Sequence, residues 1–237
     1  MRVLSIVHER AAGSGVFANA ARERRDELTE WVPAHQPLPA PGRFDAAIVF
    51  GGAMHADEES AHDWLRLEKE LLQALLAADV PTLGVCLGAQ LLAEVAGGAV
   101  TRMDAPEIGW TRVALTPAAR ADAVLAPLPE HFEAFQWHSY EVSPPADAVI
   151  LAHSRACVQA FRLVRAPWWG IQFHAEATRE TIAAWIDDYR SDQDAVRAQL
   201  DWGVLLEETA QRIDSWNELG TGICTRFLDN AELVARD

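Results

Sequence analysis

Basic residues are scarce in this chain. Its 237 residues include 20 lysines and arginines against 35 aspartates and glutamates, which gives a formal net charge of −15 at pH 7. Nucleic acids and anionic membranes would repel this charge, so we expect neither as a partner. No stretch approaches the roughly 20 apolar residues of a membrane-spanning helix. The short apolar start of the chain, which reaches charge at Glu9, is not expected to be a signal peptide.

Cysteine is also scarce. The three cysteines, Cys86, Cys157 and Cys224, are far apart and form no paired motif. This spacing argues against a disulfide framework and does not indicate a zinc site, so no metal is expected. A cytoplasmic location fits such a chain, because reducing surroundings would keep a thiol available for chemistry.

Nucleotide-binding signatures are absent as well. Gly13-Ser14-Gly15 lacks the lysine of a phosphate-binding loop and the full dinucleotide fingerprint. We interpret it as a loop and helix cap. The sequence shows no ATP-binding signature, no internal repeat and no low-complexity segment.

Apolar residues make up half of the chain, enough for a sizeable core. In the first part, apolar runs alternate with amphipathic stretches, and residues 45–50, 58–78 and 82–86 form a β-α-β unit. The expected strands in this part are residues 2–7, 30–34, 45–50 and 82–86, and the expected helices are residues 13–28 and 58–78. This alternation predicts an α/β fold with an open, mainly parallel, twisted sheet flanked by helices.

The second part of the chain is richer in strands. Short strands with little helix between them are expected at residues 99–103, 107–116, 132–142, 149–152 and 158–164. They predict a β-rich extension of the sheet before the chain returns through residues 169–174. Residues 192–237 are expected to be helical, with Gly220-Thr221-Gly222 dividing them into two helices.

The stretch at residues 81–90 has the pattern of a nucleophile elbow. Cys86 stands between Gly84 and Gly88, at the end of a predicted strand and the start of a predicted helix. Such a sharp turn forces the nucleophile into a rarely used backbone conformation, and its neighbours must lack bulk. The positive end of the helix dipole beside the sulfur favours the thiolate, which is the attacking form. The alternative is a buried cysteine beside two ordinary glycines.

A second candidate motif lies at residues 169–176. His174 and Glu176 are two residues apart, so on an extended segment their side chains point the same way. A thiolate nucleophile needs a histidine as base and acid, and that histidine needs a third group to orient it. A lone histidine at a strand end is more often structural, but a carboxylate at this spacing favours a catalytic role.

Together these motifs resemble the class I, or triad, glutamine amidotransferase family. The resemblance rests on residues 84–90 (GVCLGAQ) and 170–176 (GIQFHAE). Residues 50–54 (FGGAM) resemble the family's oxyanion turn, and residues 136–142 (QWHSYEV) resemble the substrate-contacting segment of the branch related to GMP synthetase. The four segments occur in family order.

The resemblance covers residues 1–190, which we expect to form the amidotransferase domain, with residues 191–237 as a helical extension packed on it. It implies a flavodoxin-like fold in three layers and a Cys-His-Glu triad without a cofactor. The sequence departs from many members at Ala175, where proline is common, and at Tyr140, where an acidic residue is common. The implied catalytic residues are Cys86, His174 and Glu176, the implied oxyanion donors are Gly52 and Leu87, and the implied substrate-binding residues are Gly51, Gln90, His138, Ser139 and Tyr140.

The glycine pair also has a physical reason. Acyl transfer needs unhindered backbone N–H groups where negative charge develops on the carbonyl oxygen, and glycine allows that approach. We assign one donor to Gly52 and the other to Leu87, which follows the nucleophile. A plain turn at the end of a strand is the alternative.

The expected activity is hydrolysis of the glutamine side-chain amide through a Cys86 thioester. The ammonia would pass to a separate synthase subunit or another acceptor, because no synthase domain is recognisable on the chain. Two alternatives remain open. The same triad could serve a γ-glutamyl hydrolase or peptidase, or the fold could be kept by a binding protein without activity.

Overall fold

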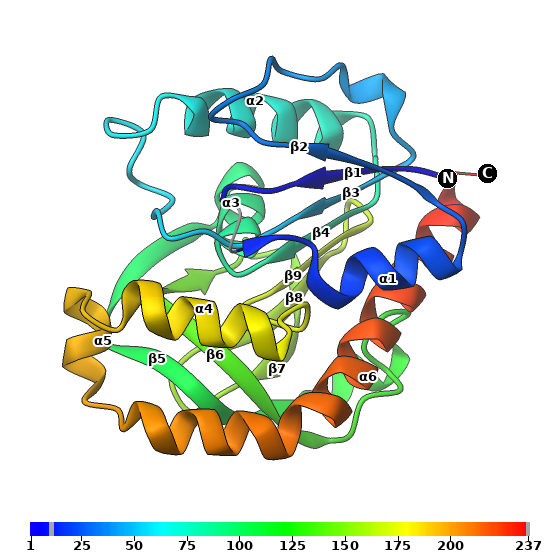
Figure 1. Ribbon diagram of the computed structural model, residues 1–237. Helices are drawn as coiled ribbons and strands as arrows, with labels where there is room; N and C mark the ends of the chain where they lie inside the picture. Colours follow the sequence, from blue (N-terminus) through cyan, green and yellow to red (C-terminus); the bar gives the residue numbers. More distant parts are fainter. Residues whose placement is uncertain (10–11, 236–237) are drawn as a thin grey trace.

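A computed structural model describes residues 1–9 and 12–235. Within these residues the chain forms one nine-stranded sheet in the order β2-β1-β3-β4-β9-β8-β7-β5-β6 (Figure 1). The strands are β1 (Arg2–Ile6), β2 (Glu27–Trp31), β3 (Ala46–Val49), β4 (Thr82–Val85), β5 (Ala99–Leu115), β6 (His131–Ser143), β7 (Ala148–His153), β8 (Val158–Leu163) and β9 (Trp168–Ile171). The α-helices are α1 (Gly15–Glu23), α2 (Trp64–Ala77), α3 (Leu87–Val95), α4 (Arg179–Tyr189), α5 (Gln193–Ala198) and α6 (Trp202–Val234).

The sheet has a parallel half and an antiparallel half. Strands β2, β1, β3, β4 and β9 run parallel, in the order typical of flavodoxin-like folds. Strands β8, β7, β5 and β6 extend the sheet with antiparallel pairs. The predicted fold class, a mainly parallel sheet with a β-rich extension and C-terminal helices, is therefore confirmed.

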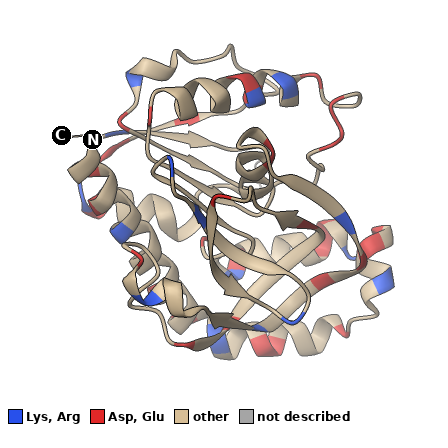
Figure 2. Ribbon diagram, turned by 180° about the vertical axis from the view of Figure 1, so that it is seen from behind, with Lys and Arg blue, Asp and Glu red and all other residues tan. Residues whose placement is uncertain are grey.

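Helices cover both faces of the parallel half, which makes three layers (Figure 1). Helices α2 and α3 pack on one face, against side chains such as Leu4 and Val49. Helices α1, α4 and α6 pack on the other, against side chains such as Val3 and Ile48. Successive side chains of a strand point to opposite faces, and burial on both faces explains why β3, β4 and β9 carry no charged residue. Figure 2 shows charged residues mainly on the helices and loops outside these strands.

The antiparallel half curls back toward the parallel half. Strand β5 is one long strand where two short ones were predicted, with its pairing to β6 shifted between Arg102 and Glu107. The N–H of His174, which follows β9, donates to the Phe135 carbonyl on β6 at 2.9 Å. This contact brings the middle of β6 to the carboxyl end of the parallel strands.

Three predicted elements in the first part have wrong boundaries, among them the helix expected at residues 58–78, which begins only at Trp64. The first helix ends at Glu23 rather than at residue 28, and the next strand occupies Glu27–Trp31 rather than residues 30–34. The chain turns at Arg25, whose φ of 63° lies in the left-handed region. Residues 27–31 pair with β1, and this pairing prevails over the helical tendency of the stretch.

The predicted break at residues 220–222 was also wrong, because α6 runs without interruption from Trp202 to Val234. The glycine at 220 serves close packing. A Cβ atom there would lie 1.9 Å from the carbonyl oxygen of Ala175. Helix α6 packs against α1 and α4 on the same face of the sheet. The division of the chain at residue 190 stays a prediction.

None of the helices in the described part of the chain is both long enough and apolar enough to span a membrane.

Candidate active site

The parallel strands carry the candidate residues to one edge of the sheet. His8 follows β1, Gly51 follows β3, Cys86 follows β4 and His174 follows β9. The carboxyl ends of parallel strands are where such sheets bind ligands. A cavity of about 290 Å³ lies at this edge, and its lining includes Cys86, His174 and Gly52. The fold thus brings together residues that are distant in sequence.

Cys86 has the backbone of a nucleophile elbow. Its φ of 52° and ψ of −112° lie in a region that residues with a side chain rarely adopt. Both flanking glycines are needed sterically. A Cβ at Gly84 would lie 2.6 Å from the Ala89 nitrogen, and one at Gly88 would lie 2.1 Å from the Val49 carbonyl oxygen. The turn therefore exists only because this sequence has glycine at both positions.

Cys86 stands at the N-terminal end of helix α3. Cys86 immediately precedes the first residue of α3, and the N–H of Cys86 donates to the Ile171 carbonyl at 2.9 Å. Its Sγ lies 3.8 Å from the Trp137 carbonyl oxygen on β6. The side chain is nearly buried but lines the cavity. A thiolate here would face the positive end of the helix dipole.

His174 and Glu176 form a buried pair beside the cysteine. His174 Nδ1 lies 2.8 Å from Glu176 Oε1. His174 Nε2 is buried without a hydrogen-bond partner that meets strict geometry within the described residues. Burial alone would lower the pKa of His174, but the charges of Glu176 and Cys86 raise it to about 10. The ring is therefore held by the carboxylate of Glu176, and Cys86 is the second group that raises its pKa.

The backbone around this pair differs from the prediction. Strand β9 ends at Ile171, so His174 and Glu176 lie on a turn rather than on an extended strand. The turn is fixed from outside. Trp216 Nε1 donates to the His174 carbonyl at 2.9 Å, and the N–H of Val16 donates to the Glu176 carbonyl at 3.0 Å. Helices α1 and α6 thus hold the pair in place.

The Gly51–Gly52 turn lies between the cysteine and His8. A Cβ at Gly51 would lie 3.0 Å from His174 Cε1 and 3.4 Å from Cys86 Cβ. Gly52 lines the cavity. Gly51, which we predicted as a binding residue, is not among the residues that line it. The next amide, that of Ala53, donates to Glu9 Oε1 at 2.7 Å.

The other predicted binding residues also line the cavity, which is bordered by Leu87, Gln90, His138, Ser139 and Tyr140. Several of their polar groups already have partners. Gln90 Nε2 lies 3.4 Å from the Tyr140 carbonyl and 3.3 Å from Gln172 Oε1. His138 Nδ1 donates to the Tyr140 carbonyl at 2.9 Å, and its Nε2 lies 3.2 Å from Glu107. His138 Nδ1 is therefore bound, whereas Nε2 faces Glu107 without a hydrogen bond of good geometry among the described residues.

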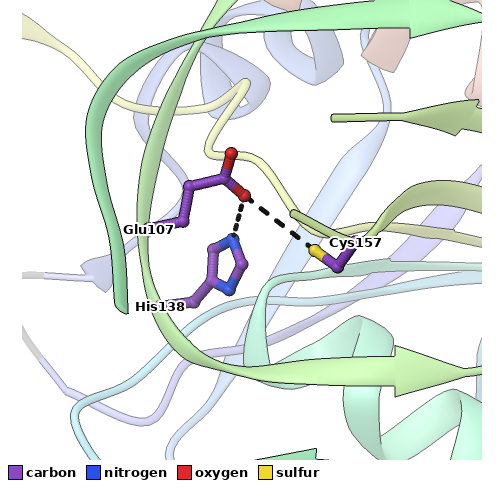
Figure 3. Close-up of side chains that lie close together, drawn as sticks. All are labelled: Glu107, His138 and Cys157. Carbon is purple, nitrogen blue, oxygen red and sulfur yellow. Dashed lines mark hydrogen bonds and ion pairs between the residues drawn. The ribbon is translucent and has the colours of Figure 1, made fainter. Parts of the chain in front are cut away.

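One group of side chains has the donor atoms of a metal site. Glu107, His138 and Cys157 bring their ligand atoms within 4.8 Å of one another (Figure 3). Hydrogen-bond donors occupy the same space, however. Gln159 Nε2 lies 2.9 Å and Ser154 Oγ 3.1 Å from Glu107 Oε2, the oxygen that also faces His138 and Cys157.

The protonation of the group agrees with hydrogen bonding. Burial and the charge of Glu107 raise the pKa of the Cys157 thiol to about 12, so this thiol stays a donor. Although burial opposes it, hydrogen bonds from His138, Ser154 and Thr111 hold the pKa of Glu107 below its ordinary value. We interpret the group as a network that fixes His138 in the cavity wall.

Sequence reasoning missed a second buried histidine–glutamate pair, His8 and Glu68. A signal was present, because Glu68 stands at helical spacing within the apolar face formed by Leu65, Leu71 and Leu75. A charged residue in such a face is rarely buried unless it is paired. Its partner could not be read from the sequence, since the two lie 60 residues apart.

The rim of the cavity was missed as well. Tyr189 donates to Glu9 Oε2 at 2.6 Å, and Arg102 pairs with Asp194 at 2.6 Å. Asp192 also lies at the rim. These residues come from four separate segments, and only folding places them around one opening.

Known proteins share both the sequence pattern and the fold of this chain. The sequence model of the family described as glutamine amidotransferase class-I matches residues 16–187. The chain is 29% identical over 241 residues to the glutamine amidotransferase-like protein YfeJ of Salmonella typhimurium, covering 99% of this chain and 98% of that protein. It is 34% identical over 151 residues to a subunit of the glutamine-hydrolysing GMP synthase of Saccharolobus solfataricus, covering 62% of this chain and 75% of that protein. A crystal structure of a glutamine amidotransferase from Thermotoga maritima matches with a TM-score of 0.83 at 27% identity, over 96% of this chain and 97% of that one.

Proposed function

The chain belongs to the class-I glutamine amidotransferase family, and we propose that it hydrolyses the side-chain amide of glutamine to glutamate and ammonia through a Cys86 thioester. The observation that carries the proposal is the joint position of Cys86, on its strained elbow, and the buried His174–Glu176 pair at one cavity. Nucleophile, acid–base group and orienting carboxylate are the parts that thiol-based acyl transfer requires.

In the first half-reaction the Cys86 thiolate attacks the amide carbon of glutamine. The carbonyl oxygen becomes an oxyanion, which accepts hydrogen bonds from the N–H groups of Gly52 and Leu87. His174, as an imidazolium, gives its Nε2 proton to the leaving nitrogen, and ammonia departs. A pKa of about 10 fits this role, because the ring holds a proton at neutral pH when the thiolate is present.

In the second half-reaction His174, now neutral, takes a proton from water. The resulting hydroxide attacks the thioester carbon, and the same N–H groups hold the second oxyanion. Collapse releases glutamate and restores the thiolate. Glu176 keeps the ring oriented throughout, through its 2.8 Å contact with Nδ1. Apart from glutamine and water, every step uses only side chains and backbone groups of this chain.

The hydrogen bonds of the turn support Gly52 as the oxyanion donor. The N–H of Ala53 is already bound to Glu9 Oε1 at 2.7 Å. Gly52 and Cys86 both line the cavity, and glycine carries no side chain that would cover its N–H.

The fate of the ammonia is proposed from the relatives. The relative from Saccharolobus solfataricus is named as one subunit of a glutamine-hydrolysing GMP synthase. We propose a comparable separate acceptor subunit for this chain, in a cytoplasmic setting.

One observation favours a second candidate, a γ-glutamyl hydrolase that uses the same triad. The cavity extends beyond the triad to Arg102 on β5 and to residues 192–195 around the start of α5. This outer part could hold a group attached to the γ-amide nitrogen. A substituted γ-glutamyl amide would then be cleaved faster than glutamine itself.

The test is intact-mass labelling with diazo-oxo-norleucine, an electrophilic analogue of glutamine. We expect one adduct on the wild-type chain, protection by glutamine, and no adduct on Cys86→Ala. Cys224→Ala is the control, because Cys224 is buried against α1 and should not affect labelling. Glutamine turnover should be lost in Cys86→Ala and kept in Cys224→Ala.

Each other outcome decides between the candidates. Turnover that survives in Cys86→Ala would contradict the mechanism. Labelling of Cys86 by a small thiol reagent, without labelling by the glutamine analogue, would favour the γ-glutamyl hydrolase. A Cys86 that reacts with neither would favour a binding protein that keeps the fold.

A further inference from the structure

His8 and Glu68 form a fully buried pair behind the Gly51–Gly52 turn. His8 follows β1 and Glu68 lies on α2, and the side chains of both are 0% exposed. His8 Nε2 lies 2.9 Å from each oxygen of Glu68, and His8 Nδ1 lies 3.0 Å from the Gly51 carbonyl oxygen. Burying two ionisable groups carries a desolvation penalty that only good hydrogen bonds offset. The proposed reaction does not use either side chain directly.

The partners of the ring define its protonation state. A carboxylate and a backbone carbonyl can only accept hydrogen bonds. Both nitrogens of His8 must therefore donate, which makes the ring an imidazolium. Burial alone would lower the pKa of His8, but the charge of Glu68 and the hydrogen bonds to Glu68 and Gly51 raise it above its ordinary value. The charged ring bridges α2 and the turn.

The contact with Gly51 fixes more than a carbonyl group. The C=O of Gly51 and the N–H of Gly52 belong to one planar peptide unit, and the described residues contain no cis peptide bond. In a trans peptide these two groups point in opposite directions. A Gly51 carbonyl directed at His8 therefore turns the Gly52 N–H away from His8. Glycine at both positions would otherwise let this peptide rotate at little steric cost.

We propose that His8, charged and held by Glu68, is a positioning residue that fixes the Gly51–Gly52 peptide with its N–H toward the oxyanion. The inference rests on the proposed function, because it takes this N–H as a donor in acyl transfer. It adds that the donor is oriented within the chain itself, before any synthase partner binds. Trp64 stacks on the face of the His8 ring, with ring centroids 5.5 Å apart.

The charged groups around His8 allow a pH test. Glu68 faces it from α2 and Glu9 is its neighbour in the chain. Cys86 and His174 lie across the turn, against the other side of Gly51. As pH rises through the pKa of His8, the ring loses one donor and the peptide is released. Glu68→Gln removes the charge that raises this pKa, so the release should occur at lower pH.

The experiment compares Glu68→Gln with Glu70→Gln, an identical change on the exposed side of the same helix. We expect Glu68→Gln to lower kcat about 10- to 100-fold, a sizeable part of the loss seen when an oxyanion donor is removed. The KM for glutamine should change by less than about threefold, because the donor acts on the transition state. The alkaline loss of kcat should begin at lower pH in Glu68→Gln, and Glu70→Gln should behave as wild type.

Crystal structures of the wild type and Glu68→Gln give a readout that does not need activity. We expect the Gly51 carbonyl to turn away from residue 8 in the variant at alkaline pH. If wild type shows no glutamine turnover, the proposed function fails, but the orientation of this peptide still decides the positioning role. An unchanged kcat, pH profile and peptide orientation in folded Glu68→Gln would overturn the inference and leave the proposed function intact.

A second variant covers the case in which Glu68→Gln does not fold. His8→Asn keeps one N–H donor for the Gly51 carbonyl but carries no charge. It should keep kcat within about 10-fold of wild type and lose the alkaline dependence that belongs to His8. A kcat more than about 10-fold below wild type, with the peptide still oriented as in wild type, would show a merely structural role and contradict positioning.

Discussion

His8–Glu68 and His174–Glu176, two of the buried histidine–glutamate pairs near the cavity, differ in what the second ring nitrogen meets. In the His8–Glu68 pair, Nδ1 lies 3.0 Å from the Gly51 carbonyl, so both nitrogens are bound. In the His174–Glu176 pair, Nε2 has no hydrogen-bond partner of good geometry among residues 1–9 and 12–235, and the Cys86 sulfur acts on the ring. Carboxylates raise the pKa of both imidazoles against the effect of burial.

From this difference we infer that the two pairs, although built from the same residue types, serve different roles. A ring bound at both nitrogens can hold neighbouring groups but has no site left for proton transfer. A ring with one nitrogen directed at a sulfur can move a proton. Leaving a buried polar atom unpaired costs about 1–3 kcal/mol. Such a cost is expected where an atom meets its partner only during a reaction.

The largest effect should come from neutralising the carboxylate of the proton-transferring pair. Glu176→Gln keeps the shape of the side chain but removes the charge that orients and stabilises the His174 imidazolium. We expect kcat to fall about 10²- to 10⁴-fold, as for other triads that lose the orienting carboxylate. Steady-state glutaminase assays measure the fall.

The comparison predicts a smaller loss for Glu68→Gln than for Glu176→Gln, because the former acts only through the position of a peptide. Equal losses would erase the distinction between the two pairs. A reversed order would assign the proton-transferring role to His8.

A smaller effect concerns stability against pH. The pKa of His174 is about 10 in the folded chain, above the ordinary value of 6.5, and that of His8 is also raised. Between the ordinary histidine pKa of 6.5 and the raised pKa of each ring, the folded state therefore binds more protons than the unfolded state. The free energy of unfolding falls as pH rises through this window. Below pH 6.5 the contribution of His174 is fully present.

Urea unfolding at several pH values measures this slope, which should not exceed about 1.4 kcal/mol per pH unit for each histidine. Glu176→Gln should flatten it, because His174 loses the largest influence that raises its pKa. The control Glu180→Gln changes an exposed carboxylate on α4 and should leave the slope as it is. A slope unaffected by Glu176→Gln would mean that the pair does not carry the charge assigned to it.

The smallest effect should come from the support of the His174 turn. Trp216 Nε1 donates to the His174 carbonyl at 2.9 Å. Trp216→Phe removes this donor and keeps most of the aromatic packing, so we expect a loss of about 1–3 kcal/mol in the free energy of unfolding. The fall in kcat should stay below about 10-fold, since Glu176 still holds the ring. A much larger fall in kcat would make Trp216 part of the positioning of His174.

Sequence alone could predict the sites that depend on local geometry. The glycines at 84 and 88 indicate the elbow, because backbone of the neighbouring segments occupies the space of any Cβ there. The spacing of His174 and Glu176 indicated a pair, although the predicted strand was wrong and the pair lies on a turn. The wrong strand did not affect the predicted pairing, since His174 Nδ1 and Glu176 Oε1 lie 2.8 Å apart in the turn as well.

Other predictions failed where distant segments decide the outcome. The Gly220 position looked like a helix break, but α6 passes through it. Glycine is required there because the turn at Ala175 approaches so closely that a side chain would not fit. Residues 27–31 form an edge strand because β1 offers a partner. Neither contact leaves a trace in the local sequence pattern.

The sequence by itself determined the fold class, and it pointed to Cys86, His174 and Glu176 as the residues of the proposed mechanism. Both depend on short-range features, namely the alternation of apolar runs and the steric needs of one tight turn. The tertiary structure alone decided how His8 and Glu68 pair across 60 residues and how His8 meets the Gly51 carbonyl. Pairing between residues distant in sequence depends on how the layers of the fold pack. A charged side chain requires a specific partner only when packing has excluded water from it.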